Sequence, residues 1–391
     1  MEQRKKVAVL LPWLKMGGTN KIGLNFMREL SGYCDVTLIL SRYTGELLDE
    51  LPEHIPLIVD TMRPFRDILK EDLRRLRLGK LWRDALYYGR IRLGRDNVDN
   101  YRYLVQRHGP VCDTEFDCAI SYHGQSPERL LNLLYRVRAK KKVAWIHGEF
   151  GNSEDHCRRM NAYYERLDHL FFVSAQTMES FLRRFAIPRS RCTVYYNPID
   201  REAVMTRAQM PCDPPLDPGV INLVTVGRLS VEKGQDMIPA VTRRLLDDGY
   251  PVRWYVIGDG DTRPVLNRLC GEHGVREQVH LLGTRTNPYP FMAGCDIYVQ
   301  PSYTEGYSTT ICEAGILGKP IVGTKSAGGI REQLENGESG LIVDATANGL
   351  YEGIRTLIEN EPLRRSLGER VSQRDFSGAG EIRKFLEFLE S

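Results

Sequence analysis

The chain has 391 residues, which is more than one hydrophobic core comfortably serves, so its length predicts two domains of roughly 200 residues each. Hydrophobic residues make up 42% and charged residues 27% of the composition, and this balance excludes a wholly disordered chain. A formal net charge of +3 over this length is too small to indicate a nucleic acid as the main partner.

The chain begins with MEQRKKVAVLLPWL, where basic residues precede an apolar run as they do in a signal peptide. Pro12 and Lys15 end that run early, so we interpret it as a first β-strand. No apolar run reaches the roughly 18 to 20 residues of a membrane-spanning helix. Nine scattered cysteines without a CxxC pair predict neither a disulfide framework nor a zinc site, and fit a reducing cytoplasm.

Short apolar runs alternate with helical patterns along the whole chain, as in parallel sheets built from βαβ units. The strands predicted before residue 200 are 6–12, 34–40, 117–122, 141–147, 169–174 and 192–197. The strands predicted after residue 220 are 221–227, 252–258, 278–283, 295–302, 319–324 and 339–344. Between the two series, five prolines from Pro198 to Pro218 indicate a linker.

These elements predict an α/β protein of two doubly wound, Rossmann-like domains with a cleft between them. We place an N-terminal domain at 1–198, a linker at 199–218 and a C-terminal domain at 219–374. A final helix within 375–391 is expected to return toward the N-terminal domain. Ligands of such sheets bind outside the carboxyl ends of the strands, so the residues that follow each strand are the candidate site residues.

In the N-terminal half, WLKMGGTNKIG places Gly17 and Gly18 after the first strand, with Thr19 or Asn20 expected as the N-cap of the next helix. A plain tight turn is the alternative interpretation of the glycine pair. The loop is not G-x-G-x-x-G, and no acidic residue clearly follows the second strand, so a dinucleotide-dependent oxidoreductase is weakly supported. His147, in WIHGEF, follows another strand and is either a structural histidine or a site residue.

In the C-terminal half, VGRLSVEKG follows the first strand and contains Arg228 and Lys233, where we expect a helix to begin. Arginine offers a planar fork of donors and lysine a mobile charge, and backbone N–H groups at a helix start add to them. This combination suits a diphosphate. Two solvated surface cations are the alternative interpretation.

The stretch TEGYSTTICEAG sets Glu305 in a loop and Glu313 about two turns into the following helix. The residues between them allow close backbone approach, and their N–H groups at the helix start can bind phosphate or sugar oxygens. An acid/base pair at one glycosidic bond needs two carboxyl groups roughly 5 to 10 Å apart, which the placement on loop and helix disfavours. A structural role for Glu313 is a further alternative.

The ordered set of NPID, GRLSVEK, VIGDG, EGYSTTICE and the Gly-rich SAGGIRE resembles the retaining glycosyltransferases of family four. That family has the GT-B architecture, in which two Rossmann-like domains face each other. The resemblance covers most of the chain and is strongest from about residue 220 to 345. It implies that the C-terminal domain binds a nucleotide-activated sugar and that the N-terminal domain mainly presents the acceptor.

The resemblance also assigns roles to single residues. It implies that Arg228 and Lys233 grip the donor diphosphate, that Glu313 holds the ribose and that Glu305 faces the transferred sugar. It places His147 near that sugar, in a positioning and electrostatic role. Gly148 follows this histidine where many members have Asp or Asn, so the role of Glu149 stays open. The remaining donor-binding positions are Gly17, Gly18, Gly227, Gly258, Gly283, Gly306, Tyr307, Ser308 and Thr309.

No cofactor and no catalytic metal are expected. Asp259-Gly260-Asp261 imitates the Asp-x-Asp metal motif of another glycosyltransferase fold, but it reads as the glycine turn after a strand. The resemblance alone implies that the anomeric configuration is retained, through attack on the face from which the diphosphate leaves. The leaving-group charge would be neutralised by the two cations and by helix-end amides.

Residues 61–108 hold 13 Lys/Arg and 6 Asp/Glu, a net charge of +7, with aromatic residues interspersed. Such a basic segment either lies on an anionic membrane surface or forms a solvated face, and both interpretations stay open. An acceptor on a membrane lipid suits this charge asymmetry. We expect a cytoplasmic protein, peripheral on the inner face of the membrane, and leave its oligomeric state open.

The predicted function is retaining transfer of a sugar from a nucleotide-diphosphate donor, a UDP-sugar rather than a GDP-sugar. The acceptor is a hydroxyl of a saccharide or a lipid-linked acceptor in cell-surface polysaccharide or glycoconjugate synthesis. One alternative is a sugar-nucleotide epimerase of the same architecture, which needs an acid/base constellation that the sequence does not show. The other is a non-catalytic protein that binds sugar nucleotides.

Overall fold

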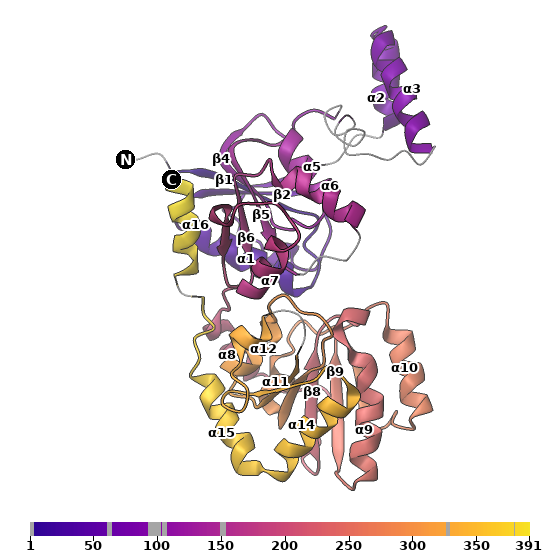
Figure 1. The fold of residues 1–391 in the computed structure, drawn as a ribbon, viewed down its shortest axis with the longest axis vertical. Helices are drawn as coiled ribbons and strands as arrows, with labels where there is room; N and C mark the ends of the chain where they lie inside the picture. Colours follow the sequence, from indigo (N-terminus) through magenta and orange to yellow (C-terminus); the bar gives the residue numbers. More distant parts are fainter. Residues whose placement is uncertain are drawn as a thin grey trace. The chain divides into compact units, whose positions relative to one another are not determined.

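A computed structural model describes residues 4–60, 65–92, 103, 108–148, 154–325, 329–378 and 380–391 of the chain. The chain divides into two compact units, which are drawn in Figure 1. Unit 1 comprises Met1–Phe172, Phe181–Thr193 and Ile382–Ser391. Unit 2 comprises Val173–Ser180 and Val194–Glu381.

Unit 1 is built on a seven-stranded sheet with the strand order β3-β2-β1-β4-β5-β6-β7. Strand β1 pairs in parallel with both β2 and β4, so the order of strands reverses between β1 and β4. In β1 every residue after Lys6 is buried, as expected for a central strand covered on both faces. The strands are β1 Lys6–Leu11, β2 Asp35–Leu40, β3 Leu57–Val59, β4 Glu115–Ser121, β5 Arg138–Ile146, β6 His169–Phe172 and β7 Cys192–Val194.

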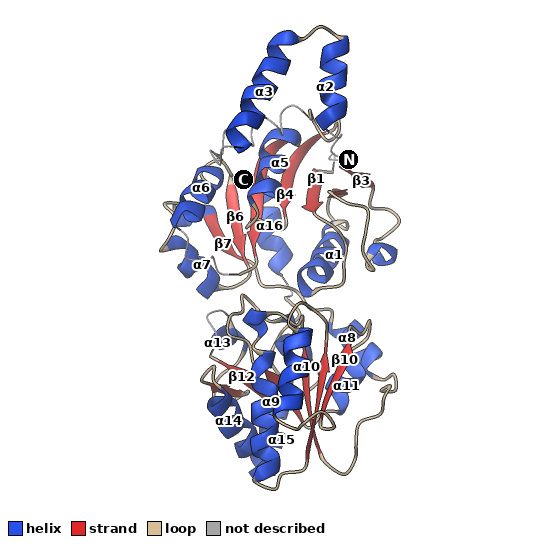
Figure 2. Ribbon diagram, turned by 90° about the vertical axis from the view of Figure 1, so that its right-hand side faces the viewer, coloured by secondary structure: helices blue, strands red, loops and turns tan. Residues whose placement is uncertain are grey.

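Helices cover this sheet, as Figure 2 shows with strands in red and helices in blue. The core contains a cluster of aromatic rings: Trp145 stacks on Phe171 with ring centroids 4.3 Å apart, and Phe26 lies 5.0 Å from Trp145. Phe385 of the last helix joins it, 5.6 Å from Phe26. The helices of unit 1 are α1 Gly18–Leu30, α2 Phe65–Arg74, α3 Leu78–Arg92, α5 Pro127–Arg136, α6 Glu154–Tyr164 and α16 Glu381–Glu390. Most of α7, Ala175–Leu182, belongs to unit 2.

Unit 2 repeats the plan with a six-stranded sheet in the order β10-β9-β8-β11-β12-β13, which reverses between β8 and β11. The indole N–H of buried Trp254 donates to the Thr225 hydroxyl at 3.0 Å, which in turn donates to the Val299 carbonyl at 2.8 Å. This chain of bonds satisfies the polar atoms in the centre of the core. The strands are β8 Ile221–Val226, β9 Val252–Ile257, β10 Val279–Gly283, β11 Ile297–Gln300, β12 Ile321–Thr324 and β13 Leu341–Val343.

In unit 2 helix α8 precedes the first strand, helices α9 to α14 alternate with the strands, and α15 follows α14. These helices are α8 Arg201–Ala208, α9 Ile238–Asp247, α10 Arg263–Glu272, α11 Tyr289–Gly294, α12 Thr309–Ile316, α13 Ile330–Gln333, α14 Ala347–Glu359 and α15 Glu361–Ser372. Among the residues that the structure describes, no helix is long and apolar enough to cross a bilayer.

All twelve predicted strands are present, and the two doubly wound sheets confirm the predicted fold class. The sequence missed β3, a three-residue strand at the edge of the sheet that is too short to show a periodic pattern. The expected N-cap was wrong: α1 begins at Gly18 with Gly17 as its N-cap, while the Asn20 amide donates to the Lys15 carbonyl at 2.8 Å. Glu149 and residues 326–328 of the Gly-rich motif lie outside the described residues.

Candidate active site

Three glycines meet at the carboxyl ends of neighbouring strands in unit 2. The Gly227 N–H, after β8, donates to the Ile257 carbonyl at 2.9 Å, and the Gly258 N–H, after β9, donates to the carbonyl of Gly283 at 2.9 Å. Gly258 has a φ of +142°, and a Cβ on it would lie 1.9 Å from the Gly227 carbonyl oxygen. Only glycine fits this position, because both the space and the backbone conformation exclude a side chain.

The loop after β8 carries Lys233, but not at the start of the helix as we had expected. Lys233 ends a short 3-10 turn, Val231–Lys233, and α9 begins only at Ile238. Gly234 follows with a φ of +64°, and a Cβ there would lie 2.2 Å from the Pro301 carbonyl oxygen. The loop therefore passes directly against the end of β11.

Lys233 and Glu305 form an ion pair across these two loops. The Glu232 carbonyl also accepts N–H bonds from Tyr303 at 2.9 Å and Thr304 at 3.1 Å, which joins the loop after β8 to the loop after β11. The Lys233 and Glu305 side chains are 23% and 13% exposed. Both charges thus lie half-buried at the point where the strand order reverses, the place where doubly wound sheets bind ligands.

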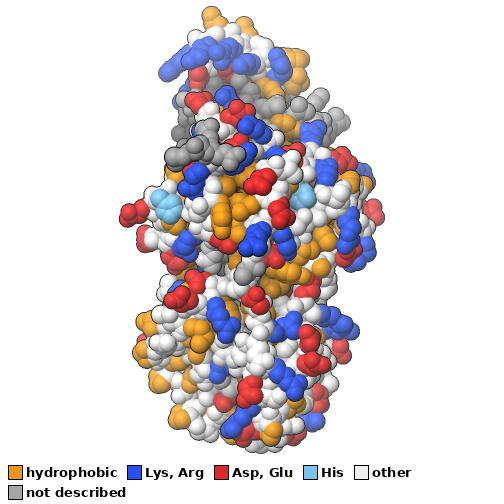
Figure 3. All heavy atoms as spheres, turned by 90° about the vertical axis from the view of Figure 1, so that its left-hand side faces the viewer, with side chains coloured by type: hydrophobic (Ala, Val, Ile, Leu, Met, Phe, Trp, Pro, Cys, Tyr) orange, Lys and Arg blue, Asp and Glu red, His pale blue; other side chains and the backbone are white. Residues whose placement is uncertain are grey.

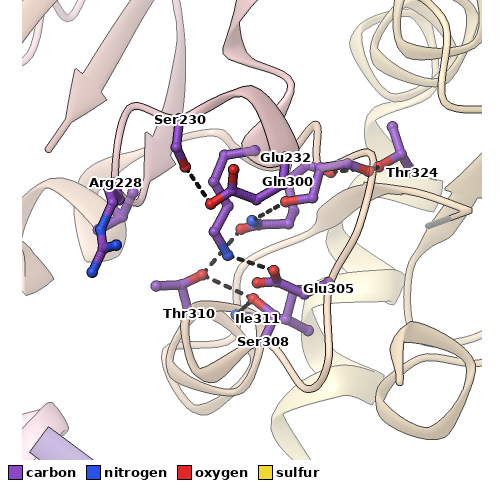
Figure 4. A network of polar contacts seen from close by, with 12 residues as sticks. Arg228, Ser230, Glu232, Gln300, Glu305, Ser308, Thr310, Ile311 and Thr324 are labelled. Carbon is purple, nitrogen blue, oxygen red and sulfur yellow. Dashed lines mark hydrogen bonds and ion pairs between the residues drawn. The ribbon is translucent and has the colours of Figure 1, made fainter. Parts of the chain in front are cut away.

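Arg228 is the second cation of the loop after β8. Figure 4 shows it on the same loop as Ser230 and Glu232, with its guanidinium extending from the backbone. Its side chain is exposed, while its carbonyl accepts the Gln235 amide at 2.9 Å. Among the described residues its guanidinium has no ion-pair partner, so its donors stay available to an anionic ligand.

Glu313 projects from α12 and is only 7% exposed. The hydroxyl of Tyr289, in α11, donates to its Oε1 at 2.9 Å. The helix is fixed at its start by Ser308, whose hydroxyl accepts the N–H of Ile311 as N-cap. The structure therefore holds the Glu313 carboxylate in one orientation, as a group that accepts hydrogen bonds.

The segment between the two glutamates is braced from α13. The Ser308 N–H donates to Gln333 Oε1 at 3.1 Å, and Gln333 Nε2 donates back to the Ser308 carbonyl at 2.6 Å. The Ser308 N–H is therefore already bonded within the protein, while a contact of this segment with the donor stays a prediction. The Gly306 carbonyl accepts the Gly329 N–H at 2.8 Å, and the Tyr307 ring lies 5.4 Å from that of Tyr196.

A buried polar network at the end of β11 contacts this segment, and it was not predicted from the sequence. Gln300, at the end of β11, accepts from the Tyr298 hydroxyl at 2.9 Å and from the Thr310 hydroxyl at 3.0 Å. Its amide donates to the Ser302 hydroxyl at 2.8 Å. Figure 4 shows Gln300 and Thr310 of this network near Glu305. A glutamine that ends an otherwise apolar strand, in DIYVQPS, was the available signal.

His147 and the Gly17–Gly18 pair belong to unit 1. The Nε2 of His147 lies 2.6 Å from the Tyr122 carbonyl, and a carbonyl only accepts, so Nε2 carries the proton and Nδ1 is an acceptor. Burial lowers the pKa of His147 to about 4. The ring is therefore neutral at pH 7, and the geometry supports a hydrogen-bonding role but not the role of a positive charge.

The Asp-Gly-Asp sequence after β9 is held by local bonds. Asp259 accepts the Gly260 N–H at 2.8 Å and pairs with Arg263 at 3.3 Å. Gly260 itself packs so closely that a Cβ would lie 2.2 Å from the Leu229 carbonyl oxygen. Asp259 therefore organises the turn that supports the loop after β8.

Solved structures share the fold over the full length of the chain. Anabaena HepE, in complex with UDP and glucose, aligns over 99% of this chain and 100% of its own with a TM-score of 0.75 and 19% identity. WaaG, a glycosyltransferase involved in lipopolysaccharide biosynthesis, aligns over 98% and 99% with a TM-score of 0.65 and 15% identity. The fold is therefore that of the GT-B proteins.

Residues 213–374 match the family described as glycosyl transferases group 1. A relative from Campylobacter jejuni is 29% identical over 212 residues, or 54% of this chain and 56% of its own. It is N-acetylgalactosamine-N,N'-diacetylbacillosaminyl-diphospho-undecaprenol 4-alpha-N-acetylgalactosaminyltransferase. The lipopolysaccharide core biosynthesis glycosyltransferase LpsE of Rhizobium meliloti is 33% identical over 44% of this chain and 48% of its own. The chain thus spans about half the length of each relative.

Proposed function

We propose that the protein is a retaining glycosyltransferase that moves a sugar from a nucleotide-diphosphate donor to an acceptor hydroxyl. The observation that carries the proposal is the half-buried Lys233–Glu305 pair, with the available Arg228 on the same loop, at the strand reversal of unit 2. A site with two cations and a separate carboxylate, Glu313, matches the charge and hydroxyl pattern of a nucleoside diphosphate sugar.

Each side chain then has a distinct role toward the donor. The diphosphate binds the Arg228 guanidinium and the Lys233 ammonium. Glu305 accepts hydrogen bonds from hydroxyl groups of the transferred sugar. The Glu313 carboxylate, oriented by Tyr289, accepts the paired ribose hydroxyls. We propose a UDP-sugar as the donor, and the UDP-bound state of the Anabaena HepE structure supports this choice.

The chemistry follows from the charges. The acceptor hydroxyl attacks the anomeric carbon on the face that the diphosphate leaves, so the new C–O bond replaces the old one with retention. A leaving diphosphate oxygen takes the acceptor proton. Arg228 and Lys233 stabilise the negative charge that develops on the leaving group, and preorganised stabilisation of this kind is usually the largest catalytic contribution. No enzymic nucleophile is needed.

The acceptor is proposed to be a saccharide or a lipid-linked acceptor in cell-surface polysaccharide or glycoconjugate synthesis. The names of the two relatives support this, since one contains diphospho-undecaprenol and the other names the lipopolysaccharide core. The basic residues of the N-terminal half also support it, because they suit an anionic surface. We therefore propose a cytoplasmic protein, peripheral on the inner face of the membrane.

The proposal is tested by incubating the protein with UDP-, GDP- and ADP-sugars and measuring thermal stabilisation and the release of free nucleotide. We expect one class, the UDP-sugars, to raise the melting temperature and to be turned over slowly. Binding without release would indicate a non-catalytic protein, and a changed sugar still attached to its nucleotide would indicate an epimerase. Either result would contradict the proposal.

A further inference from the structure

Helices α2 and α3 form a hairpin in unit 1 with an unusual distribution of side chains. The two helices are joined by residues 75–77, where Leu76 has a φ of +53°. Two carboxylates lie inside: Asp72 is 2% exposed and pairs with Arg77 at 3.5 Å, and Asp84, 1% exposed, accepts the Tyr103 hydroxyl at 2.7 Å. The hairpin thus encloses charges that are usually on a protein surface.

Large apolar side chains lie on its outside instead. Leu78, Trp82 and Leu86 recur every four residues along α3, so they share one face of the helix, and they are 64%, 69% and 47% exposed. Leu73, near the end of α2, is 60% exposed, and Leu76, in the turn, is 78% exposed. Singly exposed leucines are ordinary, but a row of them with a tryptophan on one short hairpin marks an interaction surface.

Exposed basic side chains surround this apolar row. Figure 3 shows basic side chains in blue beside apolar ones in orange at the top of the view, where Figure 1 draws α2 and α3. Arg75 pairs with Glu71 at 3.1 Å, so its charge is partly compensated. Lys70, Arg74, Lys80 and Arg83 are exposed, and among the described residues they have no ion-pair partner.

The segment that contains the hairpin is fixed at both ends by one buried arginine. Arg136 pairs with Asp60 at 2.5 Å and donates to the Gly109 carbonyl at 2.9 Å. Asp60 precedes the segment and Gly109 follows it, so the chain leaves and rejoins the sheet region at one place. Substitutions on the outer face of the hairpin therefore leave the sheet core untouched.

We propose that the α2–α3 hairpin docks on an anionic lipid bilayer, with its apolar row in the interface and its basic residues on the lipid phosphates. Tryptophan prefers the interfacial region, and lysine and arginine extend from apolar surfaces toward phosphate. A second copy of the chain is a poorer occupant, because two such hairpins would bring like charges together. The inference deepens the proposed function, on which it rests for a lipid-linked acceptor, by naming the docking element.

The test is co-sedimentation with vesicles of neutral lipid and of neutral lipid mixed with an anionic lipid. We expect the protein to bind the anionic vesicles, to bind neutral ones poorly, and to be released by added salt. Leu78→Ser with Trp82→Ser should weaken binding by about tenfold or more, since two large apolar side chains are lost. Replacing Lys70, Arg74, Lys80 and Arg83 with Ser should weaken it as well, and it leaves the Arg77–Asp72 pair inside the hairpin intact. Val265→Ser, an exposed apolar residue on α10, is the control and should bind as the wild type does.

Insertion is tested separately through Trp82. Brominated lipids should quench part of the tryptophan fluorescence of the wild type. The Trp82→Phe variant should lose most of that quenching, because Trp145 and Trp254 are fully buried and Trp13, the fourth tryptophan, is half-buried and lies outside the hairpin. Vesicle binding that is unchanged in the Leu78/Trp82 variant would overturn the proposal. So would a dimer in solution that this variant abolishes. Donor turnover without vesicles should be the same in every variant as in the wild type. If the wild type showed no turnover at all, that result would contradict the proposed function but not the docking of the hairpin on lipid.

Discussion

The Nζ of Lys233 forms an ion pair with the Oε2 of Glu305, which lies 72 positions further along the chain. The pair joins the loops after β8 and β11, between which the strand order of unit 2 reverses. We propose that the donor diphosphate attracts the Lys233 ammonium away from this pair, so that the Glu305 carboxylate becomes available to the hydroxyls of the sugar. The ion pair therefore holds both groups in place before the donor arrives.

Replacing either cation should slow the reaction more than it weakens donor binding. Arg228→Ala and Lys233→Ala should each lose about 2 to 4 kcal/mol of transition-state stabilisation, seen mainly as a lower kcat. Arg268→Ala is the matched control, because it removes an exposed cation whose ion-pair partner among the described residues is Glu272, four positions away. Steady-state kinetics check the prediction, and full turnover in both loop variants would remove the diphosphate assignment.

Glu313 should act on nucleotide affinity. Glu313→Ala removes the carboxylate proposed to hold the ribose, so the Kd for the donor and for the free nucleoside diphosphate should both rise by about tenfold to a hundredfold, as expected for hydrogen bonds to a charged group. Tyr289→Phe should have a smaller effect in the same direction, because it only loosens the carboxylate. Calorimetric titration of both variants measures this. An unchanged Kd in Glu313→Ala would assign the residue to a structural role.

Gly258 should be intolerant of any side chain. Gly258→Ala places a Cβ 1.9 Å from a backbone oxygen at a φ of +142°, so the free energy of unfolding should fall by about 2 to 4 kcal/mol. Gly219→Ala is the control, since its Cβ would meet only the Asp217 carboxylate at 3.5 Å. Chemical denaturation of the two variants should differ clearly. Equal stabilities would mean that Gly258 does not pack against the Gly227 carbonyl.

Stability should fall as the pH drops below neutrality. Burial lowers the pKa of both His147 and His169 to about 4, below the value of about 6.5 in an unfolded chain. The unfolded state therefore binds more protons between pH 6.5 and 4, and each histidine contributes up to about 1.4 kcal/mol of lost stability per pH unit in that window. Above pH 6.5 this contribution is constant.

Urea denaturation across that window checks the prediction. His169→Gln should flatten the pH dependence relative to the wild type, while His54→Gln, at an exposed position, should leave it unchanged. An identical slope in the wild type and in His169→Gln would show that the ring is not protected from protonation.

Activity should survive metal chelation. Asp259 is engaged by the Gly260 N–H and by Arg263, and the negative charge of the leaving group is proposed to fall to two cationic side chains. We therefore expect equal turnover with and without EDTA. A loss of activity that Mg²⁺ or Mn²⁺ restores would indicate that the Asp-Gly-Asp sequence binds a catalytic metal ion.

The sequence predicted the strands because apolar runs and glycine turns are local signals, and the candidate residues Arg228, Lys233 and Glu305 do lie in loops that follow strands of unit 2. It did not predict where α9 begins, because the 3-10 turns before it are fixed by contacts with the end of β11 that lie far away in the sequence. Distance along the sequence also hid the role of Gln333, which lies 25 positions from Ser308 and hydrogen-bonds its backbone N–H and carbonyl. The sequence also did not show that the α2–α3 hairpin has buried carboxylates and exposed apolar side chains, because composition gives the charge of a segment but not which side chains face inward.

The most direct test of the central claim is to follow the anomeric proton of a UDP-sugar by NMR while the protein consumes it with water or a lipid-linked saccharide as acceptor. We predict that free UDP appears together with a product that first shows the same anomeric configuration as the donor. The Lys233→Ala variant should do this far more slowly. A first product of inverted configuration would contradict the retaining mechanism, and a panel of UDP-, GDP- and ADP-sugars left intact by the wild type would contradict the claim that this protein transfers sugars.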